Sequence, residues 1–209
     1  MAKPATVRRL EPVDYGALAA LVGRVSDRSW HREDRLKPNR EFCFHHVRHI
    51  IFRFIVANRD PRHFYSTPAW LAWRGWLLPL MESAAAAYGF KRPVFPKAML
   101  AKLEAGQGID SHVDGEGSHP LVHKVHVPLR TNPRALLAVD GESIHLAPGY
   151  AWEVNNLAPH GAFNGGEGER IHFIFELFEG AGQEVVEEVA IPEVIEEGGR
   201  GRSIRLHAI

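Results

Sequence analysis

The sequence predicts a mainly β fold, an antiparallel sandwich or jelly roll, with a layer of α-helices contributed by its N-terminal part. Two observations support this prediction. Helix-like and mixed segments come first in the 209-residue chain, and seven short strand-like segments separated by Gly, Asn, Pro and Asp follow them. Helices followed by many closely spaced short strands are typical of a β core that carries helices on one face.

The change of pattern also suggests three parts. Residues 1–92 form a helical and extended layer packed on the core, residues 93–179 form the β core, and residues 180–209 form a C-terminal strand or tail. This last part is first acidic, then basic, and is interrupted by glycines. Two interpretations remain open for it, a strand that wraps around the body or a partly disordered segment.

The N-terminal layer contains two predicted helices and one extended segment. Residues 11–26 carry apolar side chains at helical spacing, whereas residues 42–56 are rich in aromatic and β-branched residues and favour a strand. Residues 67–88 predict a long helix. Thr67 suits its N-cap, and Gly89 is the natural stop because glycine adopts the left-handed conformation that ends many helices.

The strands of the core are predicted from short runs of β-branched and apolar residues. The dipeptide Asp140-Gly141 between two of them is typical of a tight hairpin turn, since both residues tolerate a positive φ. The predicted strands are residues 98–105, 121–129, 135–139, 143–147, 151–154, 160–164 and 170–178.

Charge and composition narrow the function classes. The formal net charge is zero, so no overall field attracts the chain to nucleic acid or to a membrane surface. Residues 1–100 carry 17 Lys and Arg against 8 Asp and Glu, and the second half reverses this balance. A weak polyanion-binding face is one interpretation of the basic half, and a solvated helical surface is the favoured one. Nucleic acid is therefore not expected as a partner.

The chain is expected to be a cytoplasmic protein. Cys43 is its only cysteine, which excludes an intrachain disulfide and favours a reducing compartment. The N-terminus lacks the apolar segment of a signal peptide. No apolar run reaches the roughly 18 residues that a membrane-spanning helix needs.

A candidate metal site begins with the triplet His112-Val113-Asp114. In an extended segment, residues two apart point the same way, so this imidazole and carboxylate can converge on one ion. His160, where a loop enters a predicted strand, is the best candidate for a third ligand. Two imidazoles and one carboxylate form the facial triad of non-haem Fe(II) oxygenases, which leaves coordination positions open.

Arg170 adds a second indication. It opens an otherwise apolar strand, and a guanidinium inside an apolar core needs an anionic partner. That partner is either a structural carboxylate, such as Glu153 or Glu176, or a dicarboxylate cosubstrate bound by two parallel hydrogen bonds. Strand alternation also places His126 and Lys124 on one face, where they could meet a carboxylate beside the metal.

Together these motifs resemble the aspartyl/asparaginyl β-hydroxylase family of Fe(II)- and 2-oxoglutarate-dependent oxygenases. Their order and spacing match the family pattern over roughly residues 95–178. The matching segments are HVDG (112–115), KVHVPL (124–129), GESIHLAPGYAWEVNN (141–156), HGAFN (160–164) and ERIHFIFE (169–176).

The resemblance implies a double-stranded β-helix, the jelly roll shared with cupins, and it implies roles for individual residues. His112, Asp114 and His160 would be the Fe(II) ligands, Arg170 would bind the distal carboxylate of 2-oxoglutarate, and His126 would contact its metal-side carboxylate. The cosubstrates would be 2-oxoglutarate and O2, and the reaction would hydroxylate an unactivated C–H bond.

The expected substrate is an amino acid, either free or within a peptide, such as an Asp, Asn or Pro residue. Lys124 and Arg130 are candidates for its carboxylate, and Trp152 for lining the pocket. Two rival hypotheses remain. A cupin-like isomerase or dioxygenase would keep the metal ligands but not use 2-oxoglutarate, and a binding or sensor module would carry out no reaction. The sequence does not indicate the oligomeric state.

Overall fold

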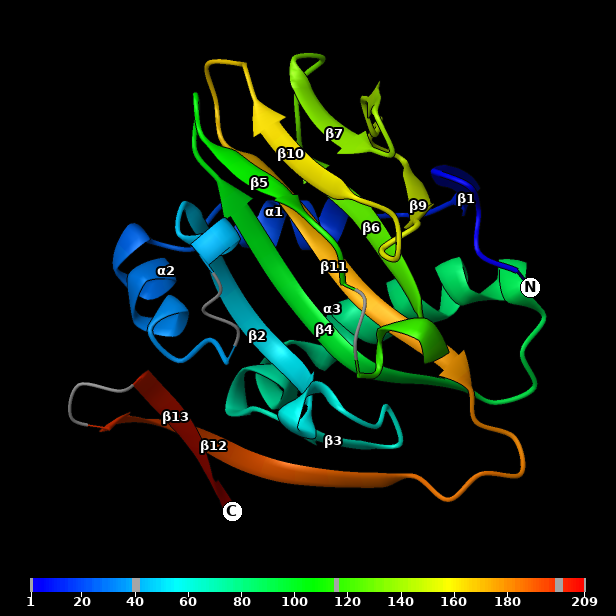
Figure 1. The fold of residues 1–209 in the computed structure, drawn as a ribbon, viewed down its shortest axis with the longest axis vertical. Helices are drawn as coiled ribbons and strands as arrows, with labels where there is room; N and C mark the ends of the chain where they lie inside the picture. Colours follow the sequence, from blue (N-terminus) through cyan, green and yellow to red (C-terminus); the bar gives the residue numbers. More distant parts are fainter. Residues whose placement is uncertain (1, 39–41, 115–116, 198–200, 209) are drawn as a thin grey trace.

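The computed structural model describes residues 2–38, 42–114, 117–197 and 201–208. The chain folds into two β-sheets that face each other, with α-helices behind the larger one (Figure 1). The helices are α1 (Gly16–Val22), α2 (Asp27–Asp34) and α3 (Pro68–Ala85). In the described part of the chain, no helix combines the length and apolarity that crossing a lipid bilayer requires.

The larger sheet has nine strands in the order β1-β9-β6-β11-β4-β2-β3-β12-β13. Their bounds are β1 (Val7–Pro12), β2 (Val47–Ile55), β3 (His63–Ser66), β4 (Pro93–Leu103), β6 (His123–Arg130), β9 (Tyr150–Val154), β11 (Arg170–Glu179), β12 (Val186–Glu197) and β13 (Gly201–Ala208).

The smaller sheet has the order β5-β10-β7-β8. Its strands are β5 (Gly108–His112), β7 (Ala135–Val139), β8 (Glu142–Ile144) and β10 (His160–Asn164). From β4 to β11 the chain passes back and forth between the two sheets, which is the winding of a double-stranded β-helix. The predicted fold, a mainly β jelly roll with an N-terminal helical layer, is therefore confirmed.

Most of the core lies between the helices and the outer face of the larger sheet. In β11, Ile171, Phe173 and Phe175 point to this face and are at most 2% exposed. Because side chains alternate along a strand, the intervening residues of β11 point to the opposite face, toward the smaller sheet. Arg170, opening the strand, belongs to that inner set.

The predicted helix over residues 67–88 is confirmed with small changes. α3 ends at Ala85, a 3-10 turn follows over Ala86–Tyr88, and Gly89 has a φ of 66°. The Thr67 side chain accepts a hydrogen bond from the Trp70 N–H, as an N-cap residue does.

All seven predicted core strands occur, with shifted ends, and the segment 42–56 contains β2. The hairpin turn is also confirmed, because Asp140 and Gly141 have φ values of 48° and 82°.

The helix predicted over residues 11–26 is too long. Its first two residues belong instead to β1, whose Pro12 aligns with Tyr150 of β9, and α1 begins only at Gly16. The described part of the C-terminal segment forms strands. β12 runs parallel to β3, with Val186 aligned with His63, and then pairs with β13 (Figure 1).

Candidate metal and cosubstrate site

A cavity between the two sheets contains most of the polar residues selected from the sequence. Its walls come from β2, β4, β6 and β11 of the larger sheet and from β5, β7 and β10 of the smaller one. The predicted site residues that line it are His112, Asp114, Lys124, His126, His160 and Arg170. The family motif's Gly115 lies outside the described residues.

His112, Asp114 and His160 converge at one point. The two histidines are aligned across the neighbouring strands β5 and β10, and their ring centroids lie 4.3 Å apart. The Asp114 carboxylate faces both rings, with its Oδ1 3.7 Å from His112 Nε2 and its Oδ2 3.9 Å from His160 Nε2. One potential ligand atom from each residue lies within 4.8 Å of the others, a spacing that fits a single metal ion.

Backbone contacts prepare these side chains for a metal. Nδ1 of His112 lies 2.9 Å from the Asp110 carbonyl, and Nδ1 of His160 lies 3.0 Å from the Ala158 carbonyl. Since a carbonyl only accepts, each Nδ1 carries the proton, and each Nε2 presents its lone pair to the cavity. Within the described part of the chain, neither Nε2 has a hydrogen-bond partner although both are buried. The donor set therefore fits a divalent transition metal.

The electrostatics of the cluster favour the protonation states that bind metal. Burial lowers the pKa of His160 to about 4, helped by the positive charge of Lys124, so its imidazole is neutral at pH 7. Burial alone would raise the pKa of Asp114, but the Lys124 ammonium, hydrogen-bonded to it, lowers that pKa well below its usual value. Asp114 is thus held as a carboxylate.

Arg170 forms the other end of the polar lining. The residue is 2% exposed, and burial lowers the pKa of its guanidinium to about 10. Its Nη2 donates to His172 Nδ1 at 3.1 Å, and that ring lies beside His126 with an Nδ1–Nδ1 distance of 3.5 Å. No Asp or Glu of the described chain pairs with Arg170. Neither of the two structural carboxylates considered from the sequence is its partner, since Glu153 contacts Arg8 and His123, and Glu176 contacts Lys97.

Two predicted substrate residues do not reach the cavity. Arg130 is exposed at the end of β6, where it pairs with Glu169 at 2.8 Å. The Trp152 indole N–H donates to the Ala147 carbonyl, and its ring packs in a small apolar cluster between the sheets. Their predicted contact with substrate is not supported by these positions. Lys124, the third candidate, does line the cavity.

Several further residues of the cavity were not predicted as site residues, although Glu176 was considered as a structural carboxylate. Lys97 and Glu176 form a buried ion pair in it at 3.1 Å, and His49 and His119 also line it. Lys97 precedes an apolar run in the sequence, and a lysine at such a position is usually exposed. Its position was recognisable only from strand pairing, which aligns Glu176 with Lys97.

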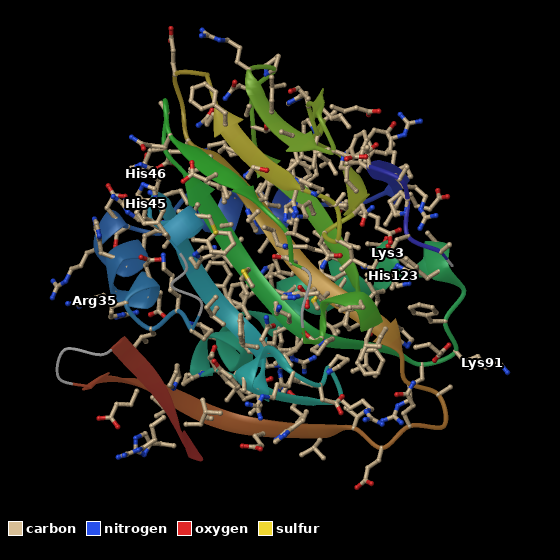
Figure 2. The ribbon with its side chains drawn as sticks, in the orientation of Figure 1. Lys3, Arg35, His45, His46, Lys91 and His123 are labelled. Atoms are coloured by element: carbon tan, nitrogen blue, oxygen red, sulfur yellow. The ribbon has the colours of Figure 1, made fainter. Side chains whose placement is uncertain are left out.

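Other groups of polar residues in the described chain have structural explanations. Asp27, Glu104 and Glu169 are close enough to hold a cation, but the buried ammonium of Lys102 already lies among them at 2.9–3.3 Å. His45 and His46 are exposed at the edge of the molecule, and their rings lie tilted against each other with centroids 3.7 Å apart (Figure 2).

Comparisons with known proteins bear on the family and the fold. Residues 80–179 match the family model described as Aspartyl/Asparaginyl beta-hydroxylase. No curated protein sequence matches.

Among solved structures, the chain is similar to an oxidoreductase of the 2OG-Fe(II) oxygenase family from Burkholderia pseudomallei. The TM-score is 0.52 at 13% identity, over 88% of this chain and 98% of the other. A viral collagen prolyl hydroxylase from Paramecium bursaria Chlorella virus-1, in complex with 2OG, gives a TM-score of 0.49 at 10% identity, over 82% and 94% of the two chains. At 13% identity, the similarity to the Burkholderia pseudomallei oxidoreductase supports the fold alone.

Proposed function

We propose that this chain, which belongs through residues 80–179 to the aspartyl/asparaginyl β-hydroxylase family, is an oxygenase. It would depend on Fe(II) and 2-oxoglutarate. Its substrate would be an amino acid, free or within a peptide, hydroxylated at an unactivated C–H bond. The observation that carries the proposal is a buried guanidinium without a carboxylate partner, that of Arg170, in the same cavity as the His112, Asp114 and His160 cluster.

Each end of this cavity has a chemical task. His112, Asp114 and His160 would hold Fe(II), which with 2-oxoglutarate and O2 supplies the oxidising power for C–H cleavage. Arg170 would donate two parallel hydrogen bonds to the distal carboxylate of 2-oxoglutarate and so gain the anionic partner that it lacks. His126, whose buried Nε2 has no protein partner, would contact the carboxylate nearer the metal.

The protein around these groups excludes water and fixes orientation. Ile174 and Leu137 line the cavity beside the polar residues, so a bound dicarboxylate would lie against apolar surface along its methylene groups. The pKa values of His126 and His172 are lowered well below normal, first by burial and then by neighbouring cations. Both rings are therefore neutral, and neither adds a positive charge to that of Arg170.

The rival hypothesis of a cupin-like enzyme without 2-oxoglutarate makes a different prediction for Arg170. Such an enzyme would keep the three metal ligands but would not need the guanidinium. An oxygenase that uses 2-oxoglutarate would form succinate, and Arg170→Ala would lower its turnover at limiting 2-oxoglutarate by about 100-fold or more, as expected for a lost charge-assisted, two-point contact.

The test is an assay of succinate formation with Fe(II), 2-oxoglutarate and pooled amino acids and peptides, with mass spectrometry for a product that has gained one oxygen atom. Arg74→Ala, which removes an exposed guanidinium on α3, is the matched control and should leave turnover unchanged. Unchanged turnover in Arg170→Ala would remove the 2-oxoglutarate hypothesis. The absence of O2 consumption with every substrate would instead favour a binding or sensor module.

A further inference from the structure

Glu176 occupies an unusual position in the cavity. Its side chain is 1% exposed and lines the cavity wall, and only one of its carboxylate oxygens is used. Oε1 accepts a hydrogen bond from Lys97 Nζ at 3.1 Å, whereas the buried Oε2 has no partner among the residues that the structure describes. A buried carboxylate oxygen without a donor is costly, so this atom is placed to gain from a hydrogen bond donated by a ligand.

Strand pairing places Glu176 close to the metal cluster. On the inner face of the larger sheet, Glu176 of β11 is aligned with Lys97 of β4 on one side and with Lys124 of β6 on the other. Side chains aligned on one face of neighbouring strands lie about 5 Å apart at their Cβ atoms. Lys124 in turn contacts Asp114 at 2.5 Å. A group bound to Glu176 would thus lie one strand away from Lys124, which contacts the candidate metal ligand Asp114.

The neighbouring cations are already engaged by other acceptors. Lys97 Nζ donates to the Asn58 amide oxygen at 2.9 Å as well as to Glu176, and it lies 4.9 Å from the Phe54 ring centroid. Lys124 Nζ donates to Asp114. Neither lysine donates to Glu176 Oε2 in the described chain, so this oxygen can accept from a ligand, and the strongest donor for a carboxylate is a cation such as an ammonium group.

We propose that Glu176 binds the ammonium group of the substrate, so that the oxygenase acts on amino acids whose α-amino group is unblocked. This inference rests on the proposed function and specifies its substrate class. Lys97 is a positioning residue, because it holds Oε1 and leaves Oε2 available as an acceptor. The unblocked ammonium group occurs in a free amino acid and at a peptide N-terminus, and the test below separates these two sources.

The first measurement compares ligands on the wild-type protein and needs no variant. Calorimetry under nitrogen, with Fe(II) and 2-oxoglutarate present, would record binding of the common L-amino acids, their N-acetyl forms and their C-terminal amides. We expect at least one free amino acid to bind about 10-fold or more tightly than its N-acetyl form, since acetylation removes the charge that Glu176 recognises. A C-terminal amide that binds as well as its free acid would indicate a peptide N-terminus, and weaker binding a free amino acid.

The second measurement uses Glu176→Gln, which keeps the shape and an oxygen for Lys97 but removes the negative charge. We expect it to weaken binding of the best free amino acid by about 10- to 100-fold, as for the loss of a charge-assisted hydrogen bond. Glu169→Gln is the matched control, because Glu169 also pairs with a buried lysine, Lys102, but lies outside the cavity. It should leave binding unchanged.

Two results would overturn the assignment of Glu176. One is equal binding of free and N-acetylated ligands, or binding of none of them, and the other is unchanged binding in Glu176→Gln. If the wild-type protein nevertheless forms succinate, only this assignment fails and the oxygenase proposal stands. If no succinate forms with any substrate while the ammonium preference is observed, the proposed function fails and the ammonium site remains.

Discussion

Lys124 and Asp114 form an ion pair inside the cavity, with Nζ 2.5 Å from Oδ2. The pair ties a residue of the larger sheet to the end of a strand of the smaller one. Its ammonium lowers the pKa of Asp114 and contributes to the lowered pKa of His160. One lysine therefore helps to keep two of the three candidate metal ligands free of protons, in His160 as an addition to the larger effect of burial.

Replacement of this lysine should make metal binding more sensitive to acid. In Lys124→Met the pKa values of Asp114 and His160 both rise, so protons compete with the metal at higher pH. We expect the pH of half-maximal Co(II) binding to move up by about one unit. Titration of Co(II) absorbance between pH 5 and pH 8 measures it, and Lys91→Met, which removes a peripheral lysine (Figure 2), is the control. An unchanged or lower midpoint would contradict this role.

The metal cluster should depend on each of its three residues. Single substitutions His112→Ala, Asp114→Ala and His160→Ala are each expected to weaken Co(II) binding by more than about 100-fold, because even the outer partners of metal ligands are worth about 10- to 100-fold. Calorimetry at pH 7.5 measures the affinity. His145→Ala is a suitable control because that ring does not line the cavity. Wild-type affinity in any one of the three variants would exclude that residue as a ligand.

Acid should destabilise the metal-free protein in a defined pH window. His160 has a pKa of about 4 in the folded chain, against 6.5 for the free side chain, so the unfolded state binds more protons between these values. Stability then rises with pH across this window and is lost as pH falls from 6.5 toward 4. For this single group the change between pH 7 and pH 5 is about 2 kcal/mol.

Urea unfolding at the two pH values tests this expectation. His160→Gln removes the titrating group, so its free energy of unfolding should fall by about 2 kcal/mol less than that of the wild type between pH 7 and pH 5. His126 and His172, whose pKa values are also lowered, leave a residual loss in the variant. Identical losses in both proteins would show that His160 is not a buried neutral imidazole.

Thr67 should stabilise the fold through two contacts of one hydroxyl. Its Oγ1 accepts from the Trp70 N–H at the start of α3 and donates to the Ile51 carbonyl of β2 at 2.8 Å. Thr67→Ala removes both and should lower the free energy of unfolding by about 2 kcal/mol, whereas Thr67→Ser should restore most of it. Urea denaturation measures the two variants. If Thr67→Ser is as unstable as Thr67→Ala, the loss of stability comes from the missing Thr67 methyl group and not from the hydroxyl.

Local sequence patterns were sufficient to predict most strands of the core and the pair His112 and Asp114, whereas the full three-residue cluster also depended on the family resemblance. The strands were recognisable because each is a short β-branched run bounded by turn residues. The H-x-D spacing succeeded because β5 ends at His112 and the chain continues extended, with the Asp114 N–H donating to the Asn156 carbonyl. The strands of the core and the convergence of His112 with Asp114 thus have local signals, whereas His160 joins them through the pairing of β10 with β5.

Long-range pairing was not predictable in the same way. β1 was assigned partly to a helix because its partner, β9, lies far along the chain and no local pattern shows that pairing. β5 was not predicted because its sequence, GIDSH, is short and mostly polar. Lys97 and Glu176 were not selected together because only the register of β4 and β11 makes them neighbours.

The pairing of β1 with β9 also has a consequence for how the chain folds. Arg8 bonds to Glu153, a partner 145 positions away, so the first strand of the larger sheet has nothing to pair with while the intervening residues are being synthesised. Closing so long a loop costs conformational entropy before any stabilising contact has formed. Strand pairings of this kind therefore form slowly and late in folding. During synthesis on the ribosome, the segment Val7–Pro12 would remain unpaired until β9 has been made. We expect a chaperone that covers this segment to raise the yield of native protein.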